Sequence, residues 1–577
     1  MALRNRIPDS RAIYPDPEFG VNLGVAQEDL KPGEAAQMQN AVFRGGTRTR
    51  LGSSRITSSA LQASKRIRGG TKYYYGTNSS KRLVAYGQHI DWVEDDGTAH
   101  TLTSSLTDDK DTFFSTWSIT DKVYIANKTD ELQEYDGTTF QPVKYVGDID
   151  IVSGTYQWTV SGSGTNEYYC ELNGSGDPSL SEPRVVVEGG QAGSDMTLGT
   201  LGSLNAGEYG YGDNDSLGYS TIYVRVTSGG PDPDTDPSDL WARYSKNIPG
   251  ESGNAAPQMM TPVLDRLLII TSNGIERSNP RVANIFSKNS TWATFRPSLV
   301  GPFTAVYPYS TRDTSGSFVQ GAVAFQANAH YLITGTDFGG DVTASSAPSE
   351  NDASIRLMDP NVGTSSPYSV ASVPGIGLFW FTSDINVFWL PFGGTVSGRM
   401  IGDKISSVTS IDGIESITLG SIDQVWMAVY DRFLRLGIPT SGNTYGDEEW
   451  WLDLKKFIID PNNPVWYGPM QGRTISRCWA EKQAGDNKLV GGEGNPTTGA
   501  FLYTLDASGV YSDAVGTSDN DISYQYQTYF KSFGSAGREK YIRSVEVDAN
   551  QYSGSATMDV TDLEGASASD LAISAVT

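Results

Sequence analysis

The chain has 577 residues with 63 glycines, 30 tyrosines and 12 tryptophans, but only 2 cysteines and 3 histidines. Two cysteines exclude a disulfide framework, and no apolar run approaches the length of a membrane span. Short aromatic or β-branched runs alternate with Gly, Asn, Asp and Ser, and long apolar helical stripes are missing. This pattern indicates an all-β protein of several domains or of one large repeat architecture.

The formal net charge of −24 is unevenly distributed. Up to Lys72 the chain holds 12 basic and 6 acidic residues, net +6, so the remainder carries net −30. A basic N-terminal segment followed by an acidic body predicts two different partners. The alternative is that the acidic charge only keeps the protein soluble and that the arm is locally basic.

Cys170 and Cys478 lie 308 positions apart without a metal-ligand spacing. We expect two free thiols in a protein assembled in a reducing cytoplasm, because Met1 to Ser10 does not resemble a signal peptide.

The stretch from Gly20 to Ile56 is the one long segment that reads as a motif. Pro32 suits the first turn of a helix, and Glu34 to Gln39 contains good helix formers. One or two helical turns are therefore predicted there, ended by Asn40.

An arginine-rich hairpin is predicted directly after this helix. Ala41 to Arg44 reads as one strand, Gly45-Gly46 as the turn, and Thr47 to Leu51 as the return strand. Alternate residues of a strand share a face, so Arg48 and Arg50 are expected to point the same way. Guanidinium forks suit carboxylates at a protein interface, with DNA phosphate as the competing ligand. We interpret four arginines as a docking element: Arg44, Arg48, Arg50 and Arg55.

Two similar segments follow at an offset of 40 residues. The strand-like run at Leu83 leads to the turn Asp96-Gly97-Thr98, and the run at Val123 leads to Asp136-Gly137-Thr138. Asp-Gly between extended runs favours a tight hairpin, because glycine tolerates positive φ. A period of about 40 residues with paired strands is typical of β-propeller blades.

The sequence thus predicts an irregular β-propeller that carries an insertion and an N-terminal arm. The predicted divisions are an arm with the basic hairpin (1–72), first blades (73–148), an inserted fibronectin- or immunoglobulin-like β-sandwich (149–250), remaining blades (251–515) and a C-terminal β segment (516–577). Strands are expected in the last segment at Ser523 to Phe530 and Ile542 to Asp548. Aromatic residues beside the later turns are predicted to form the core between blades: Phe379, Trp380, Trp389, Trp426, Trp450, Trp451, Trp466 and Trp479.

The opening of the chain resembles the tail nozzle or hub (tail tubular) proteins of short-tailed bacteriophages. The matching residues are Asn22, Leu30, Gly33, Glu34, Ala35, Asn40, Phe43, Arg44, Arg50 and Gly52. The resemblance implies a structural virion protein in a six-fold homo-oligomeric ring below the head-to-tail adaptor, with tail fibres as further partners. It also implies that DNA passes through the lumen without specific binding, retained before infection and conducted during it.

Enzyme chemistry is not expected from the motifs present. No nucleophile elbow, Walker loop, H-E-x-x-H or C-x-x-C occurs, and His89, His100 and His330 are read as structural. Asp213-Asn214-Asp215 and the run from Asp232 to Asp239 each resemble part of a calcium loop. The first lacks the bidentate Glu of that motif, and the second lacks its glycine. We therefore predict no catalytic residue, no metal and no cofactor.

Glu448-Glu449 beside Trp450-Trp451 is the strongest rival site, since carboxylates and aromatics together suit sugars. Adjacent residues of a strand point to opposite faces, which argues against a cooperating pair. A carbohydrate-binding or depolymerising tail protein is nevertheless the alternative function. A bacterial surface propeller that binds a protein is a third, disfavoured by the absence of a signal peptide.

Overall fold

The computed structural model describes most of the chain between residues 17 and 528 and one hairpin beyond it. The described ranges are 17–44, 47–76, 79–143, 149–150, 158–164, 166–170, 185–188, 194–218, 221–227, 240–243, 248–250, 254–264, 266–278, 283, 294–295, 301–312, 318–334, 354–393, 398–406, 413–483, 486–528, 555–561 and 567–574. No helix in these ranges has both the length and the apolar character to cross a membrane.

The body is a succession of four-stranded antiparallel sheets, each made by four strands consecutive in sequence. Sheet 1 is β5 (Ile67–Tyr75), β6 (Ser79–Tyr86), β7 (His89–Val93) and β8 (Ala99–Thr103); sheet 2 is β9 (Phe113–Trp117), β10 (Lys122–Ala126), β11 (Gln133–Tyr135) and β12 (Phe140–Pro142). Sheet 3 is β22 (Met259–Val263), β23 (Arg266–Thr271), β24 (Gly274–Arg277) and β25 (Thr294–Phe295); sheet 4 is β26 (Ala305–Arg312), β27 (Phe318–Phe325), β28 (His330–Thr334) and β29 (Ser354–Asp359). Sheet 5 is β30 (Val370–Val373), β31 (Gly377–Phe381), β32 (Val387–Pro391) and β33 (Arg399–Met400).

A seven-stranded sheet completes the body. Its order is β34 (Trp426–Tyr430), β35 (Phe433–Ile438), β36 (Gly446–Asp453), β37 (Trp466–Gln483), β38 (Asp486–Glu493), β39 (Leu502–Leu505) and β4 (Ser53–Arg55). The first part of β37 pairs with β36 and the second part pairs with β38. The sheet is therefore two four-stranded meanders that share one long strand, and the N-terminal β4 is the outer strand of the second.

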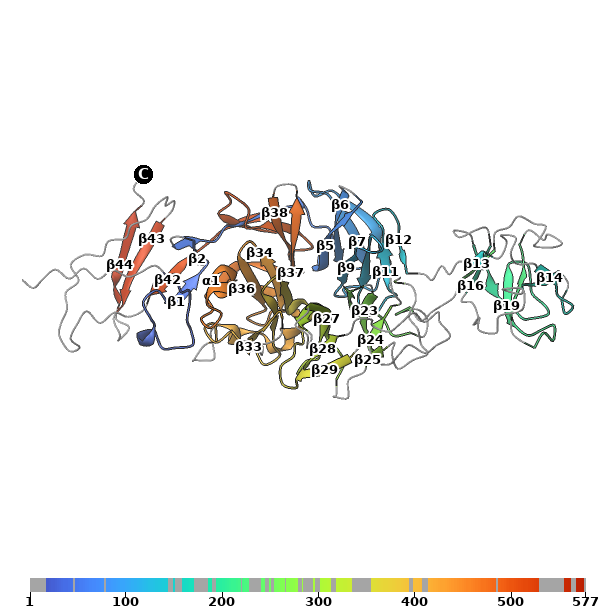
Figure 1. Cartoon of the computed structure of the whole chain (residues 1–577). Helices are drawn as coiled ribbons and strands as arrows, with labels where there is room; N and C mark the ends of the chain where they lie inside the picture. Colours follow the sequence, from blue (N-terminus) through green and yellow to red (C-terminus); the bar gives the residue numbers. More distant parts are fainter. Residues whose placement is uncertain are drawn as a thin grey trace, which may run out of the picture.

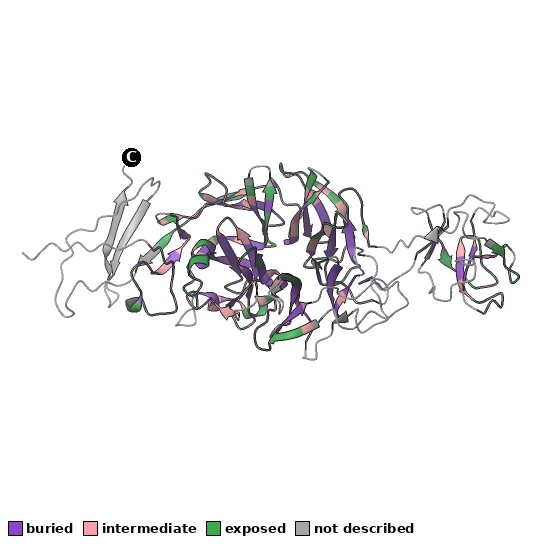
Figure 2. Cartoon of the chain, viewed as in Figure 1, coloured by how far each residue is buried: buried purple, intermediate pink, exposed green. Residues whose placement is uncertain are grey.

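Neighbouring sheets meet mainly through their first strands. In chain order β5 contacts β9, β9 contacts β22, β22 contacts β26, β26 contacts β30, β30 contacts β34, β34 contacts β37, and β37 contacts β5 again. Figure 1 shows the sheets following one another round the body in this order, and Figure 2 shows buried residues throughout the strands of the body. This succession of small antiparallel sheets is of the β-propeller type.

Aromatic side chains fill the spaces between sheets, as predicted. Trp380 lies in a buried cluster with residues of sheets 2 to 5, and Trp451 and Trp466 lie in a cluster that joins sheet 5 to the seven-stranded sheet. Another cluster joins Ala500 and Leu502 to Ile67 of sheet 1, with Trp479 packed against it. The last sheet therefore shares a core with the first.

The repeat prediction is confirmed at both turns. Gly97 lies in the hairpin between the third and fourth strands of sheet 1, and Gly137 lies in the same hairpin of sheet 2. Their φ angles are 90° and 95°. Sheets 1 and 2 share a buried cluster that includes Leu83 and Val123, so the two turns occupy equivalent places in neighbouring sheets.

Replacing Gly97 by alanine should therefore destabilise the fold by about 1–3 kcal/mol. A Cβ at Gly97 would lie 2.3 Å from the backbone oxygen of Ile56, in addition to the cost of positive φ. Gly509→Ala is the matched control, because φ is also positive there but nothing lies within 4 Å of its Cβ. Denaturant unfolding of both variants gives the comparison, and equal losses would contradict the proposed contact with Ile56.

The predicted helix at Glu34 to Gln39 is wrong. Ala35–Gln39 forms strand β1, which pairs antiparallel with β42 (Gln525–Thr528) near the other end of the chain. Ala35 and Met38 are fully buried, so this tertiary pairing outweighs the helix propensity of the segment. Asn40 ends the strand with φ 54°.

The hairpin prediction is confirmed, since β2 (Ala41–Phe43) pairs antiparallel with β3 (Thr47–Thr49).

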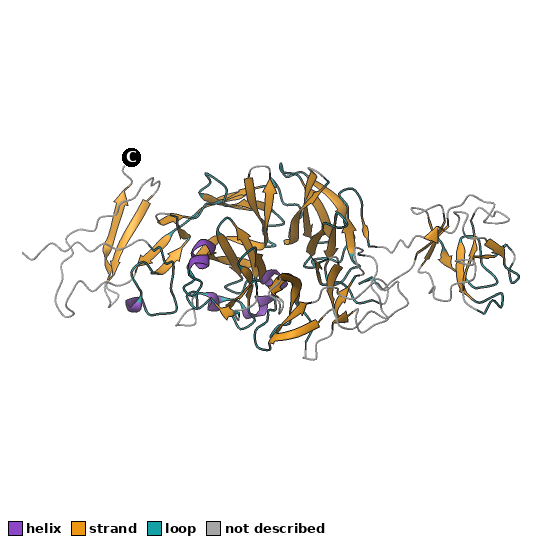
Figure 3. Cartoon of the chain, in the orientation of Figure 1, coloured by secondary structure: helices purple, strands orange, loops and turns teal. Residues whose placement is uncertain are grey.

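Helices are few and short among the described residues (Figure 3). The 3-10 turns are η1 (Gln27–Asp29), η2 (Pro367–Ser369), η3 (Ile414–Ser416) and η4 (Leu419–Gln424), and the α-helix is α1 (Leu454–Ile459). Helix α1 begins after Asp453, whose side chain accepts hydrogen bonds from the backbone N–H groups of Lys455 and Lys456. This is the usual role of an aspartate at the N-cap.

The inserted segment forms two sheets of its own, drawn apart from the body in Figure 1. One is β13 (Ile149–Asp150), β21 (Leu240–Arg243), β16 (Val185–Glu188) and β17 (Ser194–Asp195); the other is β14 (Trp158–Val160), β15 (Tyr168–Cys170), β20 (Thr221–Arg225), β19 (Glu208–Gly212) and β18 (Thr197–Leu198). Two sheets agree with the predicted sandwich. The first strand pairs with the last, however, whereas an immunoglobulin domain pairs its first strand with its second.

The structure moves two of the predicted boundaries. Strand β5 begins at Ile67, so the division after residue 72 falls inside a strand, and β4 of the predicted arm belongs to the body. Towards the C-terminus β40 (Ser512–Val515) pairs with β41 (Ser518–Asp521), and β43 (Ser555–Thr561) pairs with β44 (Ser567–Ser574). The strand expected at Ile542 to Asp548 lies outside the described residues.

Candidate functional site

The four arginines of the predicted docking element do not share one environment. Arg50 follows β3 and is 1% exposed. Its Nη1 donates to Asp513 Oδ1 at 2.8 Å, its Nη2 forms a second bond with Asp513 Oδ2, and its Nε donates to Asn40 Oδ1 at 3.0 Å. The docking role predicted for Arg50 is therefore wrong, because a buried guanidinium with these partners cannot reach another molecule.

Asn40 is the centre of the contacts around Arg50. Its Oδ1 also accepts from the backbone N–H of Gln471 at 2.8 Å, and its Nδ2 donates to the carbonyl of Ser523 at 2.7 Å. Nearby Glu34 is buried and pairs with Lys404 at 2.9 Å. Burial favours the neutral form of Glu34, but the bonds from Lys404 and from the Lys31 backbone outweigh it and lower the pKa of its carboxyl. Residues of the sequence motif thus connect the arm, the seven-stranded sheet and the C-terminal segment.

The remaining three arginines are more accessible. Arg44 pairs with Asp431 at 3.3 Å and lies over the ring of Phe433. Arg55, at the end of β4, is half-buried and pairs with Asp519 at 2.7 Å. Arg48 is exposed and forms no ion pair with a described residue. Arg48 and Arg50 do not present a common face, because β3 ends at Thr49 between them.

Glu448 and Glu449 are structural residues rather than a sugar site. Both are buried in β36, and each accepts a hydrogen bond at 2.9 Å from the indole N–H two positions further on, Trp450 and Trp451 respectively. Arg473 also donates to Glu449, at 2.8 Å. Residues i and i+2 of a strand share a face, so a sequence of E-E-W-W forms two internal pairs on opposite faces.

The acidic loop, His100 and His330 also make internal contacts. Asp213 accepts from the backbone N–H groups of Leu217 and Gly218, and Asp215 accepts from that of Gly162. His330 is buried with its Nδ1–H donating to the carbonyl of Val362 at 2.7 Å, and His100 stacks on Trp92. No group of three metal-ligating side chains was found within the described ranges. The acidic run at Asp232 to Asp239 lies outside them.

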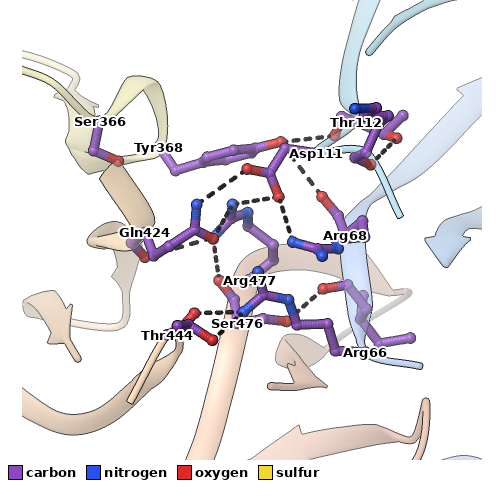
Figure 4. Close-up of polar contacts among 12 residues, drawn as sticks. Arg66, Arg68, Asp111, Thr112, Ser366, Tyr368, Gln424, Thr444, Ser476 and Arg477 are labelled. Carbon is purple, nitrogen blue, oxygen red and sulfur yellow. Dashed lines mark hydrogen bonds and ion pairs between the residues drawn. The ribbon is translucent and has the colours of Figure 1, made fainter. Parts of the chain in front are cut away.

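Sequence reasoning missed a polar cluster between the first strands of the sheets (Figure 4). We call it the arginine cluster: Arg66, Arg68, Asp109, Asp111, Tyr368, Gln424 and Arg477. Its members come from five places in the chain, at or just before β5, β9, β30 and β34 and within β37. No motif could indicate it, because residues up to 411 positions apart meet only when the sheets assemble.

The carboxylates of the arginine cluster are paired with two of its three arginines. Arg68 donates to Asp109 through Nε at 2.8 Å and also pairs with Asp111 at 3.3 Å. Arg477 pairs with Asp111 at 2.9 Å and lies 3.7 Å from the ring centre of Tyr368. Burial would raise the pKa of Asp111, but the positive charges of Arg477 and Arg68 outweigh it and lower that pKa.

Two uncharged side chains, Tyr368 and Gln424, also make hydrogen bonds within the arginine cluster. The hydroxyl of Tyr368 donates to the carbonyl of Thr112 at 3.0 Å, and its ring stacks on Phe113 with centroids 4.1 Å apart. Gln424 Nε2 donates to Asp111 at 3.2 Å, and its Oε1 accepts from Arg477 Nη2 at 3.2 Å. Side chains from sheets 1, 2 and 5 and from the seven-stranded sheet therefore meet in this part of the body.

No protein-family model matches the chain, and no curated protein matches it. Among solved structures, the chain is similar to BBS1N in a complex with ARL6DN (7% identity, 82% of this chain and 98% of that one, TM-score 0.36). It is also similar to Saccharomyces cerevisiae Sqt1 (8%, 81% and 99%, TM-score 0.31) and to YCF48 from Cyanidioschyzon merolae (9%, 67% and 97%, TM-score 0.26). Similarities this remote carry no argument about what this chain does.

Proposed function

We propose that the chain is a structural component of a short bacteriophage tail, the nozzle or hub ring attached to the head-to-tail adaptor. The observation that carries the proposal is the role of the motif residues. Asn40 and Arg50 bond to each other, Glu34 and Asn40 tie the arm to the body, and Ala35 pairs with Thr528 of the C-terminal segment. A sequence resemblance based on residues that hold the fold together supports a shared architecture.

In this proposal the body is a closed propeller of seven blades, and the inserted segment is a β-sandwich. The two meanders that share β37 are counted as two blades. Strand β4 then closes the ring by pairing with β39, through Ser53 to Arg55. The contact of β37 with β5 supports the closure.

The proposed DNA channel lies between copies of the chain. The arginine cluster and Tyr368 occupy the space between the first strands, so the propeller axis offers no path for a duplex. A homohexamer with the propellers arranged round a common axis supplies a lumen that a single copy does not. Sedimentation of the purified protein tests this, with a species of six 62.3 kDa chains expected. A monomer at every concentration would count against the ring.

Duplex DNA should bind the isolated protein weakly or not at all, even at about 50 mM salt. Each Lys or Arg that faces a phosphate adds affinity by releasing counterions, and a six-fold ring would multiply that drag. The net charge of −24 supports a wall that repels the duplex over about one Debye length, roughly 8 Å. Fluorescence anisotropy with labelled duplex measures the affinity. Tight binding with a steep salt dependence would mean that basic residues face the DNA.

Docking to the adaptor is assigned to Arg48, with Arg44 as its neighbour on the hairpin. Arg48 is exposed, so Arg48→Glu should leave the unfolding transition unchanged while preventing tail assembly. Assembly in a complementation assay measures the effect, and Arg48→Lys, which keeps the charge, is the control. Normal assembly of Arg48→Glu would remove this arginine from the interface.

The depolymerising alternative loses its candidate residues, since Glu448 and Glu449 are buried and paired. No other observation favours it.

A further inference from the structure

The arginine cluster has more cationic than anionic groups. Arg66, Arg68 and Arg477 stand against Asp109 and Asp111, and both carboxylates are already engaged by Arg68 and Arg477. Lys65 and Asp108 lie next to the cluster in sequence but pair with each other at 2.7 Å. Arg66 is therefore the arginine of the cluster that forms no ion pair with either of these carboxylates.

Within the described part of the chain, Arg66 donates hydrogen bonds to neutral groups only. Its Nη1 donates to the carbonyl and to the hydroxyl of Thr444, the latter at 3.2 Å. Nε and Nη2 donate to no described residue, although the residue is only 9% exposed. Burial and repulsion from Arg68 lower the pKa of Arg66 to about 10, because attraction to Asp111 and Asp109 offsets only part of these effects.

Arg477 provides a second, independent sign that an acceptor is lacking. Its side chain is 4% exposed, and its buried Nε has no hydrogen-bond partner among the described residues. A buried guanidinium donor without an acceptor is costly, so native structures normally provide one. Figure 4 shows the Arg66 guanidinium beside Thr444 and that of Arg477 beside Gln424 and Asp111, and the positive charge of Arg477 also lowers the pKa of Arg66.

We propose that the arginine cluster binds a small oxyanion, a phosphate or a carboxylate, at the free donors of Arg66. A planar guanidinium presents two parallel N–H donors that match two oxygens of such an anion. The anion would supply the missing negative charge at the place where the first strands of the sheets meet. The proposal does not depend on a role in a phage tail.

Titration calorimetry of the full chain with inorganic phosphate, and separately with acetate, tests the proposal against sodium chloride at matched ionic strength. We expect saturable binding of about one anion per chain, and a rise of the unfolding temperature with anion concentration. Phosphate binding alone would define a phosphate site, and equal binding of acetate would define a carboxylate site. No saturable binding of either anion would overturn the proposal.

Variants separate this site from adsorption to other basic groups. Arg66→Gln should weaken binding at least ten-fold, whereas Arg48→Gln, with the same change of charge on an exposed side chain, should leave it unchanged. If Arg66→Gln does not fold, Arg66→Lys keeps the charge but loses the fork and should also bind less tightly. Unchanged affinity in the folded Arg66 variant would overturn the proposal.

Discussion

Replacing Arg50 by methionine is expected to lower the free energy of unfolding by about 3–5 kcal/mol, a large share of the stability of most folds. The change leaves Asp513 buried at 1% exposure without its bidentate partner. It also removes the donor to Asn40 and the 2.6 Å bond from Nη2 to the carbonyl of Gln471. Denaturant unfolding followed by tryptophan fluorescence measures the loss.

Arg48→Met is the matched control, since it removes the same charge two residues away on an exposed side chain. Its effect should stay within about 0.5 kcal/mol. A second test pairs Arg50→Met with Asp513→Leu, which removes the uncompensated charge and should recover part of the stability. A small effect of Arg50→Met alone would mean that the ion pair does not hold the arm to the body.

A chain that starts at Thr57 should lose its cooperative native state. The truncation removes β4, which exposes the edge of β39, and it removes Arg50 from Asp513. It also removes the buried apolar side chains of Val21 and Met38 among others, each worth about 1.5–3 kcal/mol. Together these losses approach the 5–15 kcal/mol of a typical fold. Thermal unfolding by circular dichroism and the yield of soluble protein give the readout.

The control is a chain that ends at Gly554. It lacks the β43–β44 hairpin, whose strands pair only with each other within the described part of the chain. We expect the unfolding temperature of the body to stay the same. If the chain that starts at Thr57 unfolds as cooperatively as this control, β4 does not close the body.

Local signals in the sequence predicted the two Asp-Gly turns, the strands beside them and the buried aromatic residues correctly. The Asp-Gly turns at Gly97 and Gly137 have positive φ in equivalent hairpins, and the strands near Leu83 and Val123 form as predicted. Aromatic residues such as Trp451 are buried between sheets. These features depend on short-range turn chemistry and on hydrophobicity, which a single sequence records.

Features that depend on distant pairing could not be predicted. Ala35–Gln39 has helix-forming residues but becomes a strand because β42 lies beside it, almost 500 residues later. Nothing in the sequence of β4 indicates that this strand pairs with β39. The burial of Arg50 depends on Asp513, and a row of arginines looks the same in a sequence whether it faces solvent or a carboxylate.

The arginine cluster could not be predicted from the sequence, because its residues also meet only through distant pairing. Arg66 and Arg477 are 411 residues apart in the sequence, and neither lies in a motif. Of the candidate docking residues, the sequence pattern placed all four on one element, whereas the structure leaves Arg48 exposed and buries Arg50. Exposure of a charged side chain is decided by the tertiary partner, not by the local period.

Electron microscopy of the purified, cross-linked protein tests the central claim most directly. The account predicts a ring of six copies with an open lumen between them, and density that fills the axis of each propeller where Tyr368 and Arg477 meet. Particles that remain single copies at every concentration would contradict the ring. A ring whose copies meet at the centre without a lumen would contradict the DNA channel.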